Sequence, residues 1–106
     1  MSFLNTFTDN VRKYPNKIAL EFIDPPLQRL TYAELDESVN RAVGYLQSLG
    51  LQPGDRVALQ LSKCLEFILL HLAALRLGAI TLPLNLAYPP DELKYFLEDS
   101  GAKLFF

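Results

Sequence analysis

The chain has 106 residues, of which 50% are apolar and 21% charged, and its formal net charge is -2. This length fits one domain or part of one, with enough apolar residues for a core. The weak negative charge, without any basic run, argues against a nucleic-acid partner, because the phosphate backbone requires clustered lysine and arginine. Cys64 is the only cysteine, so an internal disulfide is excluded.

The N-terminal start and the most apolar segment both argue against a membrane location. Met1-Ser2-Phe3-Leu4-Asn5 lacks the basic and apolar regions of a signal peptide. The stretch 65–77 is interrupted by Glu66, His71 and Arg76, and it is too short to span a bilayer. We therefore expect a soluble, cytoplasmic chain with no transmembrane segment.

The first third of the chain predicts a short helix and a β-hairpin. Residues 4–14 have the pattern of a helix that ends before Pro15. Residues 18–23 have strand character, Asp24-Pro25-Pro26 is a turn signal, and residues 28–30 return as a second strand.

A longer helix follows the hairpin. Thr31 stands three residues before Glu34, which is the spacing of a capping box, and Gly50 suits the helix end. Apolar residues recur between them at three- and four-residue intervals and predict one buried stripe. They are Leu35, Val39, Ala42, Val43, Leu46 and Leu49.

Strands and helices alternate in the remainder of the chain. After a turn at Pro53-Gly54, residues 57–61 form a strand that is apolar on both faces except at Gln60. A helix at 64–77, a buried strand at 80–84, a helix between Pro90 and Gly101, and a strand beginning at 103–106 follow. We predict an α/β fold: a short N-terminal helix and β-hairpin, then an alternating βαβαβ parallel sheet with right-handed crossovers.

Two features predict that residues 1–106 are a single, partial domain. The polar residues of helix 64–77 do not cluster on one side, so this helix needs cover on nearly all sides, whereas a three-stranded sheet covers only one. The sequence also ends on Phe105 and Phe106, inside an apolar strand. We expect the exposed apolar surface and the open sheet edge to promote self-association.

Few residues have the pattern of a catalytic or binding site. Glycines 44, 50, 54, 78 and 101 are too far apart for a phosphate-binding loop. His71 can be considered as a general base or a metal ligand, and Cys64 can be considered as a nucleophile. Each of them lacks a partner residue at the required spacing. We interpret both as packed helix residues, Cys64 as a small buried one. The pairs Asp36-Glu37 and Glu98-Asp99 are interpreted as solvated helix faces. We therefore predict no catalytic and no metal-binding residue in this chain.

Several motifs, in order along nearly the whole chain, resemble those of the adenylate-forming ligases. This superfamily contains acyl-CoA synthetases, the adenylation domains of peptide synthetases, and luciferases. Leu30-Thr31-Tyr32-Ala33-Glu34-Leu35 is similar to its first core motif, and Gly78-Ala79-Ile80 through Pro83-Leu84-Asn85 is similar to its second. The segments 49–58 and 88–103 resemble the blocks that precede and follow the second motif.

Two details resemble acyl-CoA synthetases more than amino-acid adenylation domains. Adenylation domains usually carry Asp where this chain has Asn85, and the context Gln60-Leu61-Ser62-Lys63 is similar to synthetases of the malonyl-CoA or fatty-acyl-CoA type. A carrier-protein domain does not fit, because Ser38 lies inside a helix and the strands have no place in an all-helical bundle.

The resemblance implies a two-step reaction for the parent enzyme. A carboxylic acid attacks Mg²⁺-ATP to give an acyl adenylate and pyrophosphate, and coenzyme A then displaces AMP to give a thioester. In the family, the phosphate loop, the nucleotide pocket and the catalytic lysine all lie downstream of the part that matches this chain. The fragment itself therefore needs no cofactor, and its expected partner is the remainder of the parent ligase.

One loop has an expected ligand contact. Ligands of open α/β sheets bind at the carboxyl ends of the strands, and Asn85 and Leu86 follow such an end. By the resemblance, this loop lies near the path of the coenzyme A nucleotide; alternatively, Asn85 only turns the backbone before Pro89.

Two functional hypotheses follow. The first is a structural, catalytically inert N-terminal portion of an acyl-CoA synthetase. The second is a stand-alone α/β interaction module that recruits a partner through its open sheet edge. The coding sequence that follows Phe106 distinguishes them.

Overall fold

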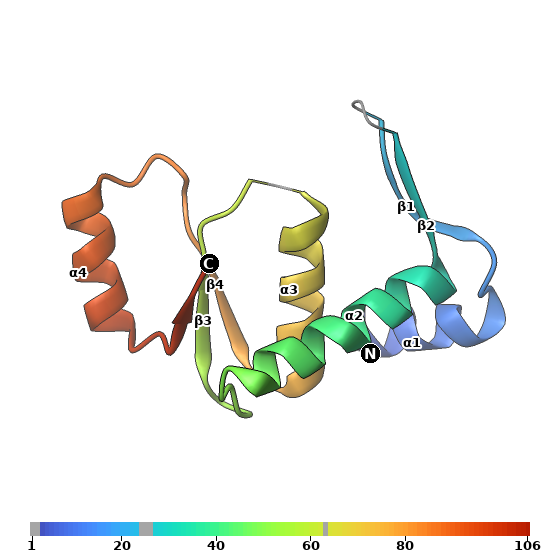
Figure 1. Ribbon diagram of the computed structural model, residues 1–106, viewed down its shortest axis with the longest axis horizontal. Coiled ribbons are helices and arrows are strands. Elements are labelled where there is room, and N and C mark those ends of the chain that lie inside the picture. The colour runs from blue at the N-terminus through green and yellow to red at the C-terminus, as the bar shows by residue number, and fades with distance from the viewer. Residues whose placement is uncertain (1–2, 24–26, 63) are drawn as a thin grey trace.

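A computed structural model describes residues 3–23, 27–62 and 64–106 (Figure 1). These residues form four helices and five strands. The helices are α1 (Phe3–Lys13), α2 (Tyr32–Ser48), α3 (Leu65–Leu77) and α4 (Pro90–Ser100). The strands are β1 (Ile18–Phe22), β2 (Gln28–Thr31), β3 (Arg56–Leu59), β4 (Ile80–Pro83) and β5 (Leu104–Phe105).

The strands form two separate sheets. β1 and β2 pair antiparallel as a hairpin, and the predicted turn at Asp24-Pro25-Pro26 lies outside the described residues. β4, β3 and β5 form a parallel sheet in that order, with β3 in the centre. The α/β fold class and the parallel sheet are confirmed.

Helices lie on both sides of the parallel sheet (Figure 1). Figure 1 shows α3 and α4 on opposite sides of the strands. The order β4-β3-β5 explains this arrangement: the connection through α3 runs one way along the sheet, and the connection through α4 runs back. Two crossovers of the same hand that run in opposite directions must place their helices on opposite faces.

Helix α2 begins and ends at the predicted signals. The Thr31 hydroxyl accepts a hydrogen bond from the Glu34 backbone N–H at 3.1 Å, and the Glu34 carboxylate accepts one from the Thr31 N–H at 2.9 Å. This reciprocal pair is a complete capping box. At the other end, Gly50 has φ +86°, which a residue with a Cβ adopts only with strain.

The core lies between α2, α3 and the central strand. Its most deeply buried large side chains are Val39 and Leu46 of α2 and Val57 and Leu59 of β3. Because β3 has a neighbour on each side and helices on both faces, its three apolar residues are fully shielded, as the sequence predicts.

The prediction of a buried strand at 80–84 is wrong for most of its length. β4 is an edge strand, and its first residue, Ile80, is 47% exposed. Leu84 is buried, but it lies just beyond the strand. A run of apolar residues does not distinguish a central strand from an edge strand.

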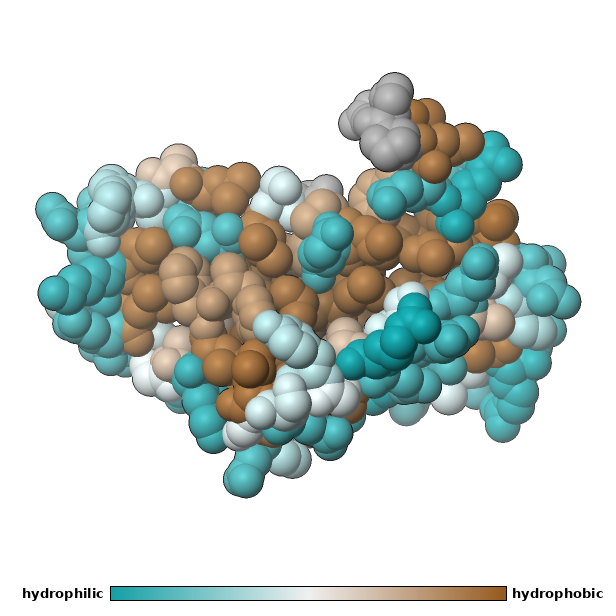
Figure 2. Space-filling model, viewed as in Figure 1, coloured by the Kyte–Doolittle hydropathy of each residue, from teal (hydrophilic) through white to brown (hydrophobic). Residues whose placement is uncertain are grey.

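Helix α3 is incompletely covered. Only Leu72, Ala73 and Ala74 are buried, although ten of its residues are neither charged nor histidine and most of these are large and apolar. The radius of gyration is 15.0 Å, above the ~13 Å typical of a compact chain of this length. In Figure 2, hydrophobic residues gather over the middle of the molecule, where α3 and the sheet lie. These observations agree with an α/β unit that leaves part of its apolar surface exposed.

Candidate functional site

The loop after β4 lies at the carboxyl end of the parallel sheet, at the edge where α/β folds bind their ligands. Leu84 is buried and its backbone N–H donates to the Leu59 carbonyl at 2.8 Å, so the ladder holds the chain up to this point. Residues 85–90 are then all exposed, and Leu86 is 58% exposed.

Asn85 determines the shape of this loop. Its side-chain Oδ1 accepts a hydrogen bond from the Ala87 N–H at 2.8 Å, and its backbone carbonyl accepts one from the Tyr88 N–H at 3.2 Å. Asn side chains that bond to the backbone two residues on form a tight local turn. Asn85 therefore turns the backbone, which is one of the two roles that we considered for it from the sequence. Leu86 is exposed on this turn.

Gln60 connects the same loop to the central strand. Its side-chain Nε2 donates to the Asn85 carbonyl at 3.1 Å. From the sequence, Gln60 was interpreted only as the one polar residue of an apolar strand. Its hydrogen bond to the Asn85 carbonyl was not predicted. A single polar side chain next to the carboxyl end of a buried strand was the available signal, because a polar group there requires a hydrogen-bond partner.

His71 has the packed role that the sequence predicts. Its ring stacks on Phe67 with centroids 6.1 Å apart, and its Nδ1 shares a hydrogen bond of 3.0 Å with the Thr81 hydroxyl. The hydrogen bond to Thr81 ties α3 to β4. Cys64 is the residue before α3, and its side chain is half-buried, so the prediction of a buried cysteine is wrong. A helix-start position faces solvent more than the helix interior does.

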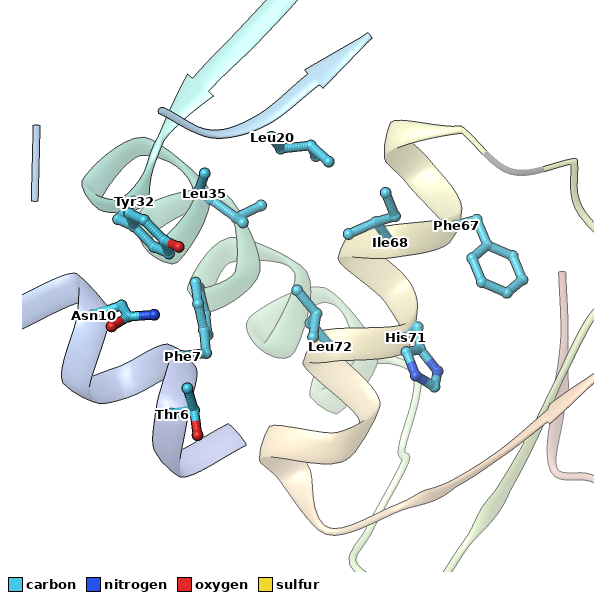
Figure 3. A pocket seen from close by; sticks show the side chains of 11 residues that line it. Thr6, Phe7, Asn10, Leu20, Tyr32, Leu35, Phe67, Ile68, His71 and Leu72 are labelled. Atoms are coloured by element: carbon cyan, nitrogen blue, oxygen red, sulfur yellow. The ribbon is translucent and has the colours of Figure 1, made fainter. Parts of the chain in front are cut away.

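A cavity of about 520 Å³ lies between α1, the hairpin, α2 and α3. Figure 3 shows Leu20, Leu35, Ile68 and Leu72 around it, with the polar end of Tyr32 directed toward the space. Among the described residues that line it, none is Asp, Glu, Lys or Arg. These walls suit apolar packing rather than a phosphate or a carboxylate.

A second hollow, of about 470 Å³, lies between α2 and α3. Its wall includes Tyr45, Leu69 and Phe106, and the Tyr45 and Phe106 rings lie 6.3 Å apart. Like the first cavity, this hollow is almost entirely apolar. Glu66 is the only charged residue among the described residues that line it.

The described residues contain no group of three or more His, Cys, Asp or Glu side chains placed to hold a metal ion. The positive-φ glycines stand at separate element ends, and the Gly54 N–H already donates to the Gly78 carbonyl at 2.9 Å. A phosphate cradle requires several backbone N–H groups that converge on one anion.

The comparison with protein families is decisive for the affiliation of the chain. The family model for the AMP-binding enzymes matches residues 7–106. The chain belongs to the AMP-binding enzyme family. This match includes both motifs that resemble the adenylate-forming ligases, so the resemblance is confirmed.

Relatives of this AMP-binding segment include two classes of ligase. It is 38% identical over 96 residues to phosphinothricin tripeptide synthetase PhsC of Streptomyces viridochromogenes, covering 91% of this chain and 9% of that protein. It is 38% identical over 103 residues to the oxalate–CoA ligase of Arabidopsis thaliana, covering 95% of this chain and 20% of that protein. The chain thus spans a fifth or less of the length of these relatives.

A solved structure has the same fold. The N-terminal subdomain of NpsA from Klebsiella oxytoca, in complex with anthranilyl-AMSN, matches with a TM-score of 0.86 and 27% sequence identity. The match covers 98% of this chain and 27% of that one.

Among the residues that the structure of our chain describes, no helix is both long and apolar enough to cross a membrane.

Proposed function

We propose that these residues are the N-terminal portion of a ligase that activates a carboxylic acid as an acyl adenylate and transfers the acyl group to coenzyme A. The observation that carries the proposal is the match of the AMP-binding family model across residues 7–106. Relatives in both the peptide-synthetase and CoA-ligase classes support the adenylate-forming step. Asn85, at the position where adenylation domains usually carry Asp, favours coenzyme A over a carrier protein as the acceptor.

The role of the segment in this proposal is structural. The apolar hollows beside α3 match a surface that the remainder of the ligase covers, and ATP and Mg²⁺ are held by that remainder. Burying such surface contributes about 25 cal/mol per Å², so the segment and the remainder stabilise one another. Because the reaction consumes ATP and coenzyme A, we place the enzyme in the cytoplasm.

The one ligand contact that we assign to this segment is the loop of Asn85 and Leu86. The loop is exposed, is ordered by its own hydrogen bonds and lies at the carboxyl edge of the sheet. An exposed leucine suits the apolar part of a pantetheine arm, and the loop would border the path by which coenzyme A enters.

The test is carboxylate-dependent exchange of pyrophosphate into ATP, followed by thioester detection by mass spectrometry. The complete ligase is expected to catalyse both steps, and the pure 106-residue chain neither. Robust exchange by the pure chain would contradict the structural role. A complete protein that forms acyl adenylate but transfers the acyl group only to a carrier protein would contradict the assignment of coenzyme A.

A further inference from the structure

Gln60 stands at the junction between the central strand and the loop of Asn85. It follows β3 directly and is half-buried, whereas the three residues before it, 57–59, are fully buried. Its Nε2 donates to the Asn85 carbonyl at 3.1 Å, a contact between residues 25 positions apart in the sequence. The contact therefore joins two strand ends rather than two neighbours on one strand.

The hydrogen bonds of the loop divide into two kinds. The bonds from Ala87 and Tyr88 to Asn85 are local, so they set the shape of the turn but not its position relative to the sheet. The ladder bond of Leu84 to Leu59 holds the chain immediately before the loop. The Gln60 side chain extends this attachment by one residue, onto the carbonyl about which the turn is built.

We propose that Gln60 is a positioning residue for the acceptor thiol: it holds the loop of Asn85 and Leu86 at the carboxyl edge of the sheet, where coenzyme A approaches. This inference rests on the proposed function. Gln60 acts through the loop and does not itself contact the ligand. A loop that is already held in place loses less conformational entropy when a ligand binds to it. Loss of the Gln60 hydrogen bond therefore weakens the binding of the thiol without changing the chemical step.

The position of Gln60 predicts an effect confined to one half-reaction. Adenylation precedes entry of the thiol, and in the proposed function ATP and Mg²⁺ are held by the remainder of the ligase. A general structural role would instead lower the melting temperature and reduce both half-reactions together. The separation of the two half-reactions therefore distinguishes positioning from stability.

The experiment compares the complete ligase with its Gln60→Ala and Gln60→Glu variants. Glu has the size of Gln but its carboxylate cannot donate to the Asn85 carbonyl. Gln47→Ala is the matched control, because Gln47 is exposed on α2, outside the loop. Both Gln60 variants are expected to raise the KM for coenzyme A about two- to tenfold, which corresponds to one hydrogen bond. Pyrophosphate exchange and the melting temperature should stay at wild-type values.

Two results would overturn the proposal. One is an unchanged KM for coenzyme A in both Gln60 variants. The other is an equal loss of exchange and thioester formation, which would assign Gln60 to the stability of the sheet. If the wild-type ligase shows no carboxylate-dependent exchange, the proposed function fails. Amide hydrogen exchange at Ala87 and Tyr88 then tests the positioning alone: faster exchange in Gln60→Ala supports it, and unchanged exchange refutes it.

Discussion

At the scale of single residues, Arg76 connects the three N-terminal helices. Its Nη1 lies 3.0 Å from the Asp36 carboxylate and 2.8 Å from the Asn40 side-chain oxygen, both on α2. Its guanidinium also lies over the Phe7 ring of α1, 5.4 Å from the centroid. The Arg76 and Asp36 side chains are only 21% and 31% exposed, so solvent screens this pair less than the surface pairs.

Replacing Arg76 should therefore destabilise the packing of α1, α2 and α3. We expect Arg76→Ala to lower the free energy of unfolding by about 1–2 kcal/mol. Arg76→Lys should recover part of the loss, since it keeps the charge but not the planar fork. Urea unfolding measures the difference. Arg41→Ala is the control, because the Arg41–Glu37 pair is largely exposed and should cost about 0.5 kcal/mol or less. Equal losses at the two arginines would contradict this role.

Asp36 also corrects an interpretation of the sequence. The pair Asp36-Glu37 was expected on a solvated helix face, and Glu37 is indeed exposed and paired with Arg41 along the helix. Asp36 instead faces Arg76 on the next helix. Residues adjacent in a helix point about 100° apart, so two neighbouring carboxylates need not share an environment.

Asp55 is the carboxylate with a shifted pKa at the amino end of the sheet. The hydrogen bond from the Gln52 backbone N–H, and then Lys103, lower the pKa of Asp55 below its ordinary value of 3.8. The Asp55 Oδ2 lies 2.8 Å from the Gln52 nitrogen and 3.3 Å from the Lys103 Nζ. Lys103 in turn donates to the Gly50 carbonyl at 2.7 Å, so these contacts link the end of α2, the turn before β3 and the start of β5.

This pKa shift predicts a pH dependence of stability. A carboxylate whose pKa is lower in the folded state stabilises the fold above its unfolded pKa, and the contribution is lost as pH falls through the folded value. The stability difference between wild type and Asp55→Asn should therefore be constant at neutral pH and should shrink below pH 3.8. Urea unfolding at a series of pH values measures it. A difference that grows as the pH falls would refute the assigned sign.

At the scale of elements, the helix boundaries were largely predictable because they depend on local chemistry. Pro15, the capping box of Thr31 and Glu34, and Gly101 act within one turn of the backbone, and the helices begin or end beside them. Strand environment was less predictable. The runs 57–61 and 80–84 are similarly apolar, yet β3 is central and β4 is an edge. Pairing order depends on which strands meet across the sheet, and one strand's sequence does not contain that information.

The capping box gives a test at the element scale. Thr31→Ala removes the acceptor of the Glu34 N–H and is expected to lower the free energy of unfolding by about 0.5–2 kcal/mol. Glu34→Ala removes the reciprocal acceptor, and the double variant should lose less than the sum, because the two bonds support one helix start. Chemical denaturation of the four proteins measures the coupling. Strict additivity would show that the two hydrogen bonds are independent.

At the scale of the whole molecule, the isolated chain exposes surface that a compact domain would bury. α4 buries none of its eleven residues, Phe105 on the edge strand β5 is 46% exposed, and α3 is covered only in part. Open strand edges and exposed apolar patches favour association.

We expect the isolated 106-residue chain to be marginally stable or to dimerise through the sheet edge. Sedimentation velocity at increasing concentration should give a mass that rises above the 12.0 kDa monomer. Phe105→Lys should reduce this rise, because a charge on an edge strand opposes pairing with a second edge. Tyr95→Lys, on the exposed side of α4, is the matched control. A monomer with a cooperative transition at high temperature would refute this expectation.

The sequence by itself determined the family, the order of the elements and the positions of the helix caps. The family follows from a series of motifs in order along the chain. The elements and the helix caps follow from residue types at short spacing, because periodicity and short-range hydrogen bonding act locally. Only the tertiary structure decided that β3 is central, that Asp36 faces Arg76, and that Gln60 reaches the Asn85 carbonyl. Each of these contacts joins residues 24 or more positions apart, so it exists only after the elements have packed.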